Sequence, residues 1–144
     1  MKKSLAVFFA MALTASAASA ADIYVSLETG KNKNDGSKAA PLKNLWKALE
    51  VSQIGDTIHL AEGNYPGKMK QGWFMMDKPV SIIGGYSKDF SERNPLTHKT
   101  MFQPVNENND KKGNGLGLLH LEFDKTNNAP KGFNMVIDGL IIDD

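Results

Sequence analysis

Only one segment of the chain has the spacing of an amphipathic helix, and this limits the fold more than any other feature. Between Pro41 and Gly55, apolar side chains recur at i, i+3, i+4 and i+7, at Leu42, Leu45, Trp46 and Leu49. Pro41 suits the first turn of a helix, where its missing N–H costs nothing, and Gly55-Asp56 is a turn signal. We therefore predict a single helix over residues 41–52, with Trp46 in the core.

The rest of the chain has the pattern of short strands separated by Gly, Asn, Asp and Pro. Residues 57–61 and 118–123 alternate between apolar and polar side chains, as strands with one buried face do. Further strands are predicted at residues 23–26, 79–83, 100–102 and 136–142, the last with a bend at Asp138-Gly139. Gly84-Gly85 is expected to end the strand at 79–83, Gly63-Asn64-Tyr65 to form a turn, and residues 72–76 to form a loop.

Apolar anchors of these strands recur at nearly regular spacing. The anchors Ile58, Ile82, Phe102, Leu119 and Ile137 are 24, 20, 17 and 18 residues apart. This recurrence suggests a solenoid, in which each coil buries its face on the next. The alternative is a meander sandwich, with strands every 8–12 residues or so and hairpin turns, which the Gly-Asp and Asp-Gly pairs could form.

The N-terminus has the three parts of a secretory signal peptide. Lys2 and Lys3 supply the positive charge, and Ala18-Ser19-Ala20 is a small-residue cleavage site. The apolar core between them, Leu5 to Leu13, is too short to span a bilayer of about 30 Å. We expect residues 1–20 to be removed and residues 21–144 to form one exported domain, periplasmic or extracellular, with no membrane span.

Composition restricts the chemistry of the exported chain. Cleavage leaves 124 residues with a formal charge of −1, so we expect no electrostatic attraction to nucleic acid or anionic lipid. The absence of cysteine excludes disulfides, thiolate metal sites and a cysteine nucleophile. Stability must come from apolar burial and backbone pairing, which a domain of this size can supply.

Three groups of residues carry a family resemblance. They are Tyr24-Val25-Ser26, Asn34-Asp35-Gly36-Ser37, Pro41, Ala48-Leu49, Gly55-Asp56-Thr57-Ile58, Gly63 and Tyr65; then Ile83-Gly84-Gly85-Tyr86, Phe90, Arg93-Asn94-Pro95 and Thr100; and Ile137-Asp138-Gly139-Leu140-Ile141. The first group resembles the N-terminal motif, of the DUF1565 type, of secreted parallel β-helix proteins of the pectate-lyase-like superfamily. The second is similar to a loop of large bacterial surface β-helix proteins, and the third to the coil-closing step of the same folds.

The resemblance implies an all-β fold, a right-handed parallel β-helix with one N-terminal capping α-helix. In lyases of this group the calcium ligands and the basic catalyst lie on later coils, so no catalytic or cofactor-binding residue is assigned here. An apolar strand, Leu140-Ile141-Ile142, precedes only Asp143-Asp144, and no cap is visible there. We expect a domain incomplete at its C-terminus, with further coils or a partner chain on the open end; the alternative is a short natural protein.

Histidine and aspartate are the candidate metal ligands. His59 and His120 are expected on outer strand faces, where stacked coils could bring them together, but zinc needs a third or fourth ligand. Exposed surface histidines are the default expectation, for His98 as well. Asp138, Asp143 and Asp144 form the best acidic cluster for calcium, although the Asp-Gly bend alone explains Asp138. Asn34-Asp35-Gly36 is a turn first and a ligand loop second.

Other motifs have structural explanations. Trp73, Phe74 and Met75-Met76 could stack on sugar rings, but packing between the helix and the first coil is the expected use. Gly84-Gly85 lacks the lysine and following helix of a phosphate-binding loop. No Ser/His/Asp arrangement is recognisable.

Two functions therefore fit the sequence. The first is the handling of extracellular polysaccharide, as a β-eliminating lyase on uronate polymers whose catalytic coils lie beyond this chain and whose full-length form could bind calcium. The second is a non-enzymatic surface adhesin or carbohydrate-binding scaffold. A short interaction protein, complete as it stands, is a third interpretation.

Overall fold

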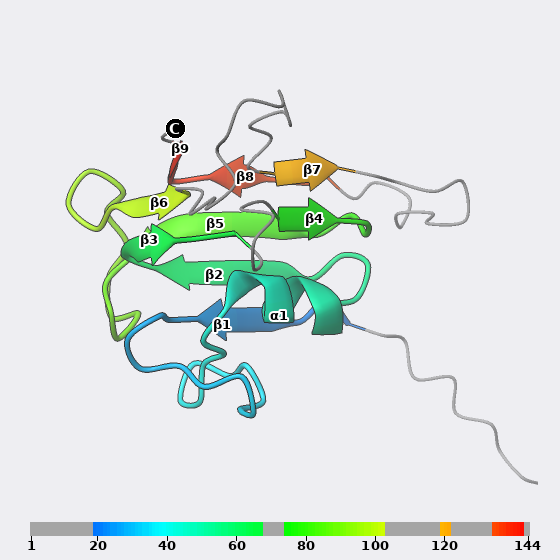
Figure 1. Cartoon of the computed structure of the whole chain (residues 1–144), viewed down its shortest axis with the longest axis horizontal. Helices are drawn as coiled ribbons and strands as arrows, with labels where there is room; N and C mark the ends of the chain where they lie inside the picture. The colour runs from blue at the N-terminus through cyan, green and yellow to red at the C-terminus, as the bar shows by residue number, and fades with distance from the viewer. Residues whose placement is uncertain (1–18, 68–73, 103–118, 122–133, 143–144) are drawn as a thin grey trace, which may run out of the picture.

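The computed structural model describes residues 19–67, 74–102, 119–121 and 134–142, and this part of the chain is mostly short strands with one short helix (Figure 1). In chain order the elements are β1 (Asp22–Val25), α1 (Leu45–Val51), β2 (Thr57–Ala61), β3 (Gly63–Tyr65), β4 (Phe74–Met76), β5 (Ser81–Tyr86), β6 (Thr100–Phe102), β7 (Leu119–Leu121), β8 (Ile137–Asp138) and β9 (Leu140–Ile142). Within the described residues, no helix has the length and hydrophobicity needed to cross a membrane.

The strands form three parallel sheets. Their orders are β1-β2-β5-β8, β3-β6-β9 and β4-β7, and every pairing between these strands is parallel. The chain visits the sheets in a repeated order: β2, β3 and β4 enter the three sheets in turn, and β5, β6 and β7 then stack on them (Figure 1). A meander sandwich would need antiparallel hairpins, so that alternative is wrong.

Apolar side chains of equivalent position lie on one another in this stack. Ile23, Ile58 and Ile82 are in register across β1, β2 and β5, and all three are buried. Tyr65 of β3 is in register with Phe102 of β6, and both are at most 1% exposed. The core therefore lies between the three sheets, where α1 adds Leu45, Ala48 and Leu49.

The helix begins four residues later than predicted, at Leu45 rather than at Pro41. The backbone of Leu42 pairs with β1 instead: its N–H donates to the Tyr24 carbonyl at 2.9 Å, and its carbonyl accepts the Ser26 N–H at 2.9 Å. Asn44 is extended and precedes the first helical residue. The predicted apolar stripe is confirmed for Leu42, Leu45 and Leu49, which are buried, whereas Trp46 is only partly buried against the core.

Gly84-Gly85 is predicted to end its strand. This prediction is wrong, because the pair lies inside β5. The register between β2 and β5 shifts beyond His59, so that Ala61 pairs with Tyr86. Gly85 has a φ of 87°, in the left-handed region that a glycine enters at no steric cost. The glycine pair therefore forms an irregular step, and the strand continues through it.

Two strands were missed, and the regular spacing of anchors was misleading. Gly63–Tyr65 and Phe74–Met76 form β3 and β4, where the sequence predicts a turn and a loop. Ile58, Phe102 and Leu119 belong to three different sheets. The true repeat within one sheet is 24 residues from Ile58 to Ile82 and 55 residues from Ile82 to Ile137, because the connecting loops differ in length.

Candidate functional site

Two open hollows lie side by side on the surface and share one wall. The first hollow measures about 410 Å³ and is lined by Thr29, Lys31, Asn34, Lys38, Ala39, Ala40, Pro41, Lys88, Asp89 and Phe90. The second hollow measures about 510 Å³ and is lined by Leu27, Glu28, Glu62, Gly63, Lys88, Thr97 and Lys99. Lys88 belongs to both. The site is thus built where the loop after β1 meets the β5–β6 loop.

The loop after β1 is held in shape by its own polar side chains. Asn34 donates from its side-chain amide to the Pro41 carbonyl at 2.9 Å, and Asp35 accepts the Ser37 N–H at 2.8 Å. Gly36 completes the turn at a φ of 84°. The prediction that Asn34-Asp35-Gly36 is a turn is confirmed. The turn brings Lys31 and Lys38 to the same hollow.

Positive charge predominates around the first hollow. Lys31, Lys38 and Lys88 line it against the single carboxylate of Asp89. Neither Lys31 nor Lys38 forms an ion pair with another residue that the structure describes, whereas Lys88 pairs with Glu28 at 2.6 Å. Two ammonium groups without an acidic partner among the described residues make the hollow suitable for an anionic ligand.

The opposite wall is a tight turn in the β5–β6 loop. Asp89 Oδ1 accepts hydrogen bonds from the Ser87 hydroxyl at 2.8 Å and from the Ser91 hydroxyl at 2.8 Å. These bonds favour the ionised carboxylate and lower the pKa of Asp89 to about 2, the Ser87 bond having the largest effect. Phe90 follows at a φ of 60°, an uncommon conformation for a residue with a side chain.

Phe90 is fixed there by aromatic contacts. Its ring meets Tyr24 edge-on, with centroids 5.0 Å apart, and lies 6.0 Å from Tyr86. The ring is 5% exposed. The contacts therefore attach the turn that carries Lys88 to the outer face of β1 and β5.

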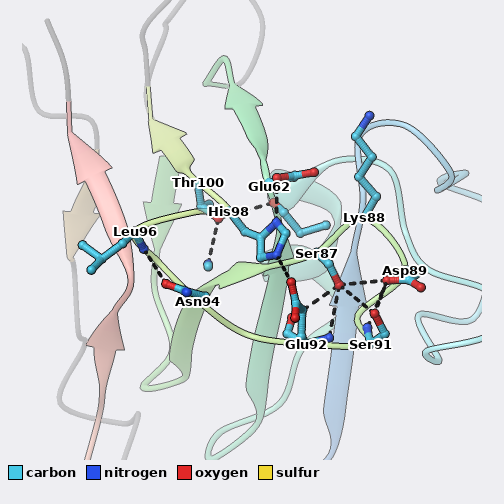
Figure 2. Close-up of polar contacts among 12 residues, drawn as sticks. Glu62, Ser87, Lys88, Asp89, Ser91, Glu92, Asn94, Leu96, His98 and Thr100 are labelled. Atoms are coloured by element: carbon cyan, nitrogen blue, oxygen red, sulfur yellow. Dashed lines mark hydrogen bonds and ion pairs between the residues drawn. The ribbon is translucent and has the colours of Figure 1, made fainter.

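The β5–β6 loop is attached a second time through His98 (Figure 2). His98 Nδ1 lies 2.9 Å from Glu62 Oε2, and His98 Nε2 lies 2.6 Å from Glu92 Oε1. The bonds to Glu92 first and Glu62 second raise the pKa of His98. His98 is not the exposed surface histidine that was predicted, since only 14% of its side chain is accessible.

His59 has a similar set of partners. Its Nε2 lies 2.8 Å from Asp22 Oδ1 and its Nδ1 lies 3.0 Å from the Tyr86 hydroxyl, while Tyr24 stacks on the ring at a centroid distance of 4.8 Å. The expectation of an exposed histidine is wrong here too, because 13% of the side chain is accessible. His120 lies on β7 in another sheet, opposite Met75, so stacking does not bring it to His59.

The proposed acidic cluster is only partly within the described residues. Asp138 forms an ion pair with Arg93, whose Nε also donates to the Gly84 carbonyl at 2.9 Å. The pairing with Arg93 lowers the pKa of Asp138. Asp143 and Asp144 lie outside the described residues, and among those residues no three histidine or acidic side chains are arranged to hold a metal ion.

The aromatic segment before β5 packs as expected. Phe74 and Met76 are buried, and the Phe74 ring lies 5.1 Å from that of Phe102. Met75 points outward and is 46% exposed. Trp73 lies outside the described residues.

Sequence reasoning missed most of the site. No pattern in the sequence groups Lys31, Lys38 and Lys88, and none connects Glu62, Glu92 or Tyr86 with a histidine. Their separations of 36 residues for Glu62 and His98 and 27 for His59 and Tyr86 carry no periodic signal. The one usable signal was local: Glu92 lies six residues before His98, within one loop.

Comparison with known proteins agrees with the first group of resembling residues. Residues 28–85 match a family described as a protein of unknown function (DUF1565), which is associated with β-helix proteins. No curated protein and no solved structure matches the chain.

Proposed function

We propose that this protein is an exported right-handed parallel β-helix protein that binds acidic extracellular polysaccharide. The fold part of the proposal is supported by the three parallel sheets, which the chain visits in a repeated order with apolar side chains in register. Export is supported by the three-part N-terminal signal in residues 1–20. The helix α1, which packs against β1 and β4, takes the role of the N-terminal cap.

The single observation that carries the binding proposal is the charge of the first hollow. Lys31 and Lys38, with no acidic partner among the described residues, converge there with Lys88. Ammonium groups bind carboxylates as point charges, and a uronate polymer presents one carboxylate per sugar. The hydroxyl of Thr29 is available beside them for sugar hydroxyls.

The same hollow favours binding over bond cleavage. Among the described residues that line it, the only carboxylate is that of Asp89, whose pKa of about 2 makes it a poor proton acceptor near neutral pH. We therefore propose a carbohydrate-binding role for the described residues. A polysaccharide lyase would place its proton-abstracting base outside them, with calcium as an additional group in the full-length protein.

Titration calorimetry with oligogalacturonate and with a neutral oligosaccharide of equal length tests the proposal. We expect binding of the acidic sugar only, weakened at least tenfold in Lys31→Ala/Lys38→Ala and weakened by added salt. The control variant is Lys33→Ala/Lys43→Ala, which removes two exposed lysines that do not line the hollow. Equal affinity for both sugars, or equal loss in both variants, would contradict the proposal. Ultraviolet absorbance of unsaturated product reports any lyase activity in the same samples.

A further inference from the structure

His98 holds two carboxylates from different parts of the chain, and this requires a particular protonation state. Glu62 follows β2, and Glu92 lies in the β5–β6 loop, at 2.9 Å and 2.6 Å from the two ring nitrogens. An ionised carboxylate only accepts hydrogen bonds, and a neutral imidazole carries one N–H. Both contacts can therefore be made together only when His98 is an imidazolium.

The two ends of this bridge differ in how firmly they are held. At Glu62, the backbone N–H donates to the Tyr86 carbonyl at 2.7 Å, and the next N–H, of Gly63, donates to the Lys99 carbonyl at 2.9 Å. The backbone of Glu92 is bonded within its own loop, where its carbonyl accepts the Ser87 N–H at 3.0 Å and its N–H donates to the Ser87 hydroxyl at 3.2 Å. Glu92 has a side chain that is 67% exposed, against 28% for Glu62. Loss of the His98 proton should therefore release Glu92 first.

The charged groups around His98 act in both directions. Glu92 and Glu62 favour the imidazolium, and desolvation of the ring opposes it. The nearby cations are Lys99, adjacent in sequence, and Lys88, which feels the Glu62 charge. Glu28 compensates Lys88 through their ion pair. The two carboxylates in direct contact outweigh the desolvation of the ring, because the pKa of His98 is raised overall.

We propose that His98 is a proton-operated clasp on the β5–β6 loop, and that its protonation strengthens binding of acidic polysaccharide by ordering the wall that carries Lys88. Lys88 lies on this loop (Figure 2), between β5 and the aromatic attachment at Phe90. It lines both hollows. The effect on polysaccharide binding rests on the proposed function. The protonation-dependent contact of His98 with Glu62 and Glu92 does not.

The direction of the pH effect follows from the raised pKa of His98 in the folded protein. A group with a raised folded-state pKa contributes stability that is fully present below its unfolded value, about 6.5 for histidine. That contribution is lost as the pH rises through the folded-state value. The loop is thus clasped below the ordinary histidine pKa and released as the pH rises through the raised pKa of His98.

The clasp is tested by NMR on the whole chain described by the sequence. The ring resonance that disappears in His98→Gln identifies His98, and its titration should lie above the ordinary histidine value and move down in Glu92→Gln. Amide exchange of residues 88–98, corrected for intrinsic rates, should lose protection as His98 deprotonates in the wild type. Glu50→Gln, which removes a carboxylate from the distant Lys47 pair on α1, should leave both unchanged. A His98 titration at or below the ordinary value, or protection that does not follow it, overturns the clasp.

Calorimetry with oligogalacturonate then tests the coupling. Wild-type affinity should fall about fivefold or more across the His98 titration, in the usual range of coupling between sites, and this dependence should be absent in His98→Gln. If His98 titrates above the ordinary histidine value, as expected, but binding does not depend on pH, the coupling is overturned. No binding at any pH, with the NMR result intact, contradicts the proposed function and leaves the clasp standing.

Discussion

At the scale of single residues, the glycine pair in β5 decides how closely neighbouring segments approach. A Cβ on Gly84 would lie 2.4 Å from the carbonyl oxygen of Gly139, and one on Gly85 would lie 2.6 Å from Pro95 Cγ and 2.8 Å from Pro95 Cα. Real Cβ atoms do not approach other atoms so closely. These positions therefore let the β8–β9 turn and the β5–β6 loop rest directly on the strand.

Replacing Gly85 by alanine should destabilise the protein by about 1–3 kcal/mol, because the new methyl meets backbone atoms at a φ of 87°. The matched control is Gly36→Ala, at a φ of 84°, where the nearest atom is the side-chain Cγ2 of Ile23 at 3.1 Å. Backbone strain is similar in both variants, so chemical denaturation should show the larger loss for Gly85→Ala. Equal losses would mean that the contact with Pro95 is unimportant.

At the scale of elements, the β5–β6 loop connects strands that are far apart in the chain. It contacts β1 through the Phe90–Tyr24 ring pair, Glu62 through His98, and β8 through the Arg93–Asp138 ion pair. Arg93 also lies over the Tyr86 ring, 5.8 Å from its centroid. The loop is thus a structural clamp along the first sheet as well as a wall of the site.

The Arg93–Asp138 pair should make stability depend on pH in acid. The pair lowers the pKa of Asp138 in the folded protein, so its contribution is present above the unfolded value of about 3.9 and is lost as the pH falls through the folded-state value. Thermal melts between about pH 6 and about pH 2 should show a smaller fall in Tm for Arg93→Gln than for the wild type.

Arg93→Gln/Asp138→Asn is the control for that series. With both charges removed, the difference between the variant and the wild type should again shrink as the pH falls, as it does for Arg93→Gln alone. A profile for either variant parallel to that of the wild type would show that the pair does not contribute to stability.

At the scale of the whole molecule, the three sheets share one core. The Phe102 ring of β6 lies 6.2 Å from that of Tyr65 in the same sheet and 5.1 Å from that of Phe74 in the next. Tyr65 donates its buried hydroxyl to the Ala61 carbonyl of β2 at 2.9 Å, and burial raises the pKa of this phenol. Contacts of this kind make the sheets interdependent.

Phe102→Ala should cost about 3–5 kcal/mol, the usual range for removing a buried phenylalanine, and it should lower the transition seen by far-UV circular dichroism and by tyrosine fluorescence equally. Met101→Ala is the control, since Met101 precedes Phe102 on the same strand and is only partly buried. Separate transitions for the two probes would show that the sheets unfold independently.

Local patterns in the sequence were sufficient for what depends on neighbouring residues. The strands at 57–61 and 100–102 have the predicted bounds, and the buried stripe of α1 and the turn at Asn34-Asp35-Gly36 follow from periodicity and side-chain bonding to the nearby backbone. Leu42 marks the limit of such reasoning. Its position in the apolar pattern correctly predicts that the side chain is buried. Its backbone, however, is paired with β1 and is not part of the helix.

The sequence by itself therefore determined the single helix, the apolar faces, the turn at Asn34-Asp35-Gly36 and the strands other than β3 and β4. Only the tertiary structure decided which strands stack, that β3 and β4 are strands at all, and that Lys31, Lys38 and Lys88 share a hollow beside the Glu62–His98–Glu92 bridge. The physical reason is that parallel pairing joins residues across loops of unequal length. The packing of the core then determines which residues are in contact, and no regular spacing in the sequence predicts these contacts.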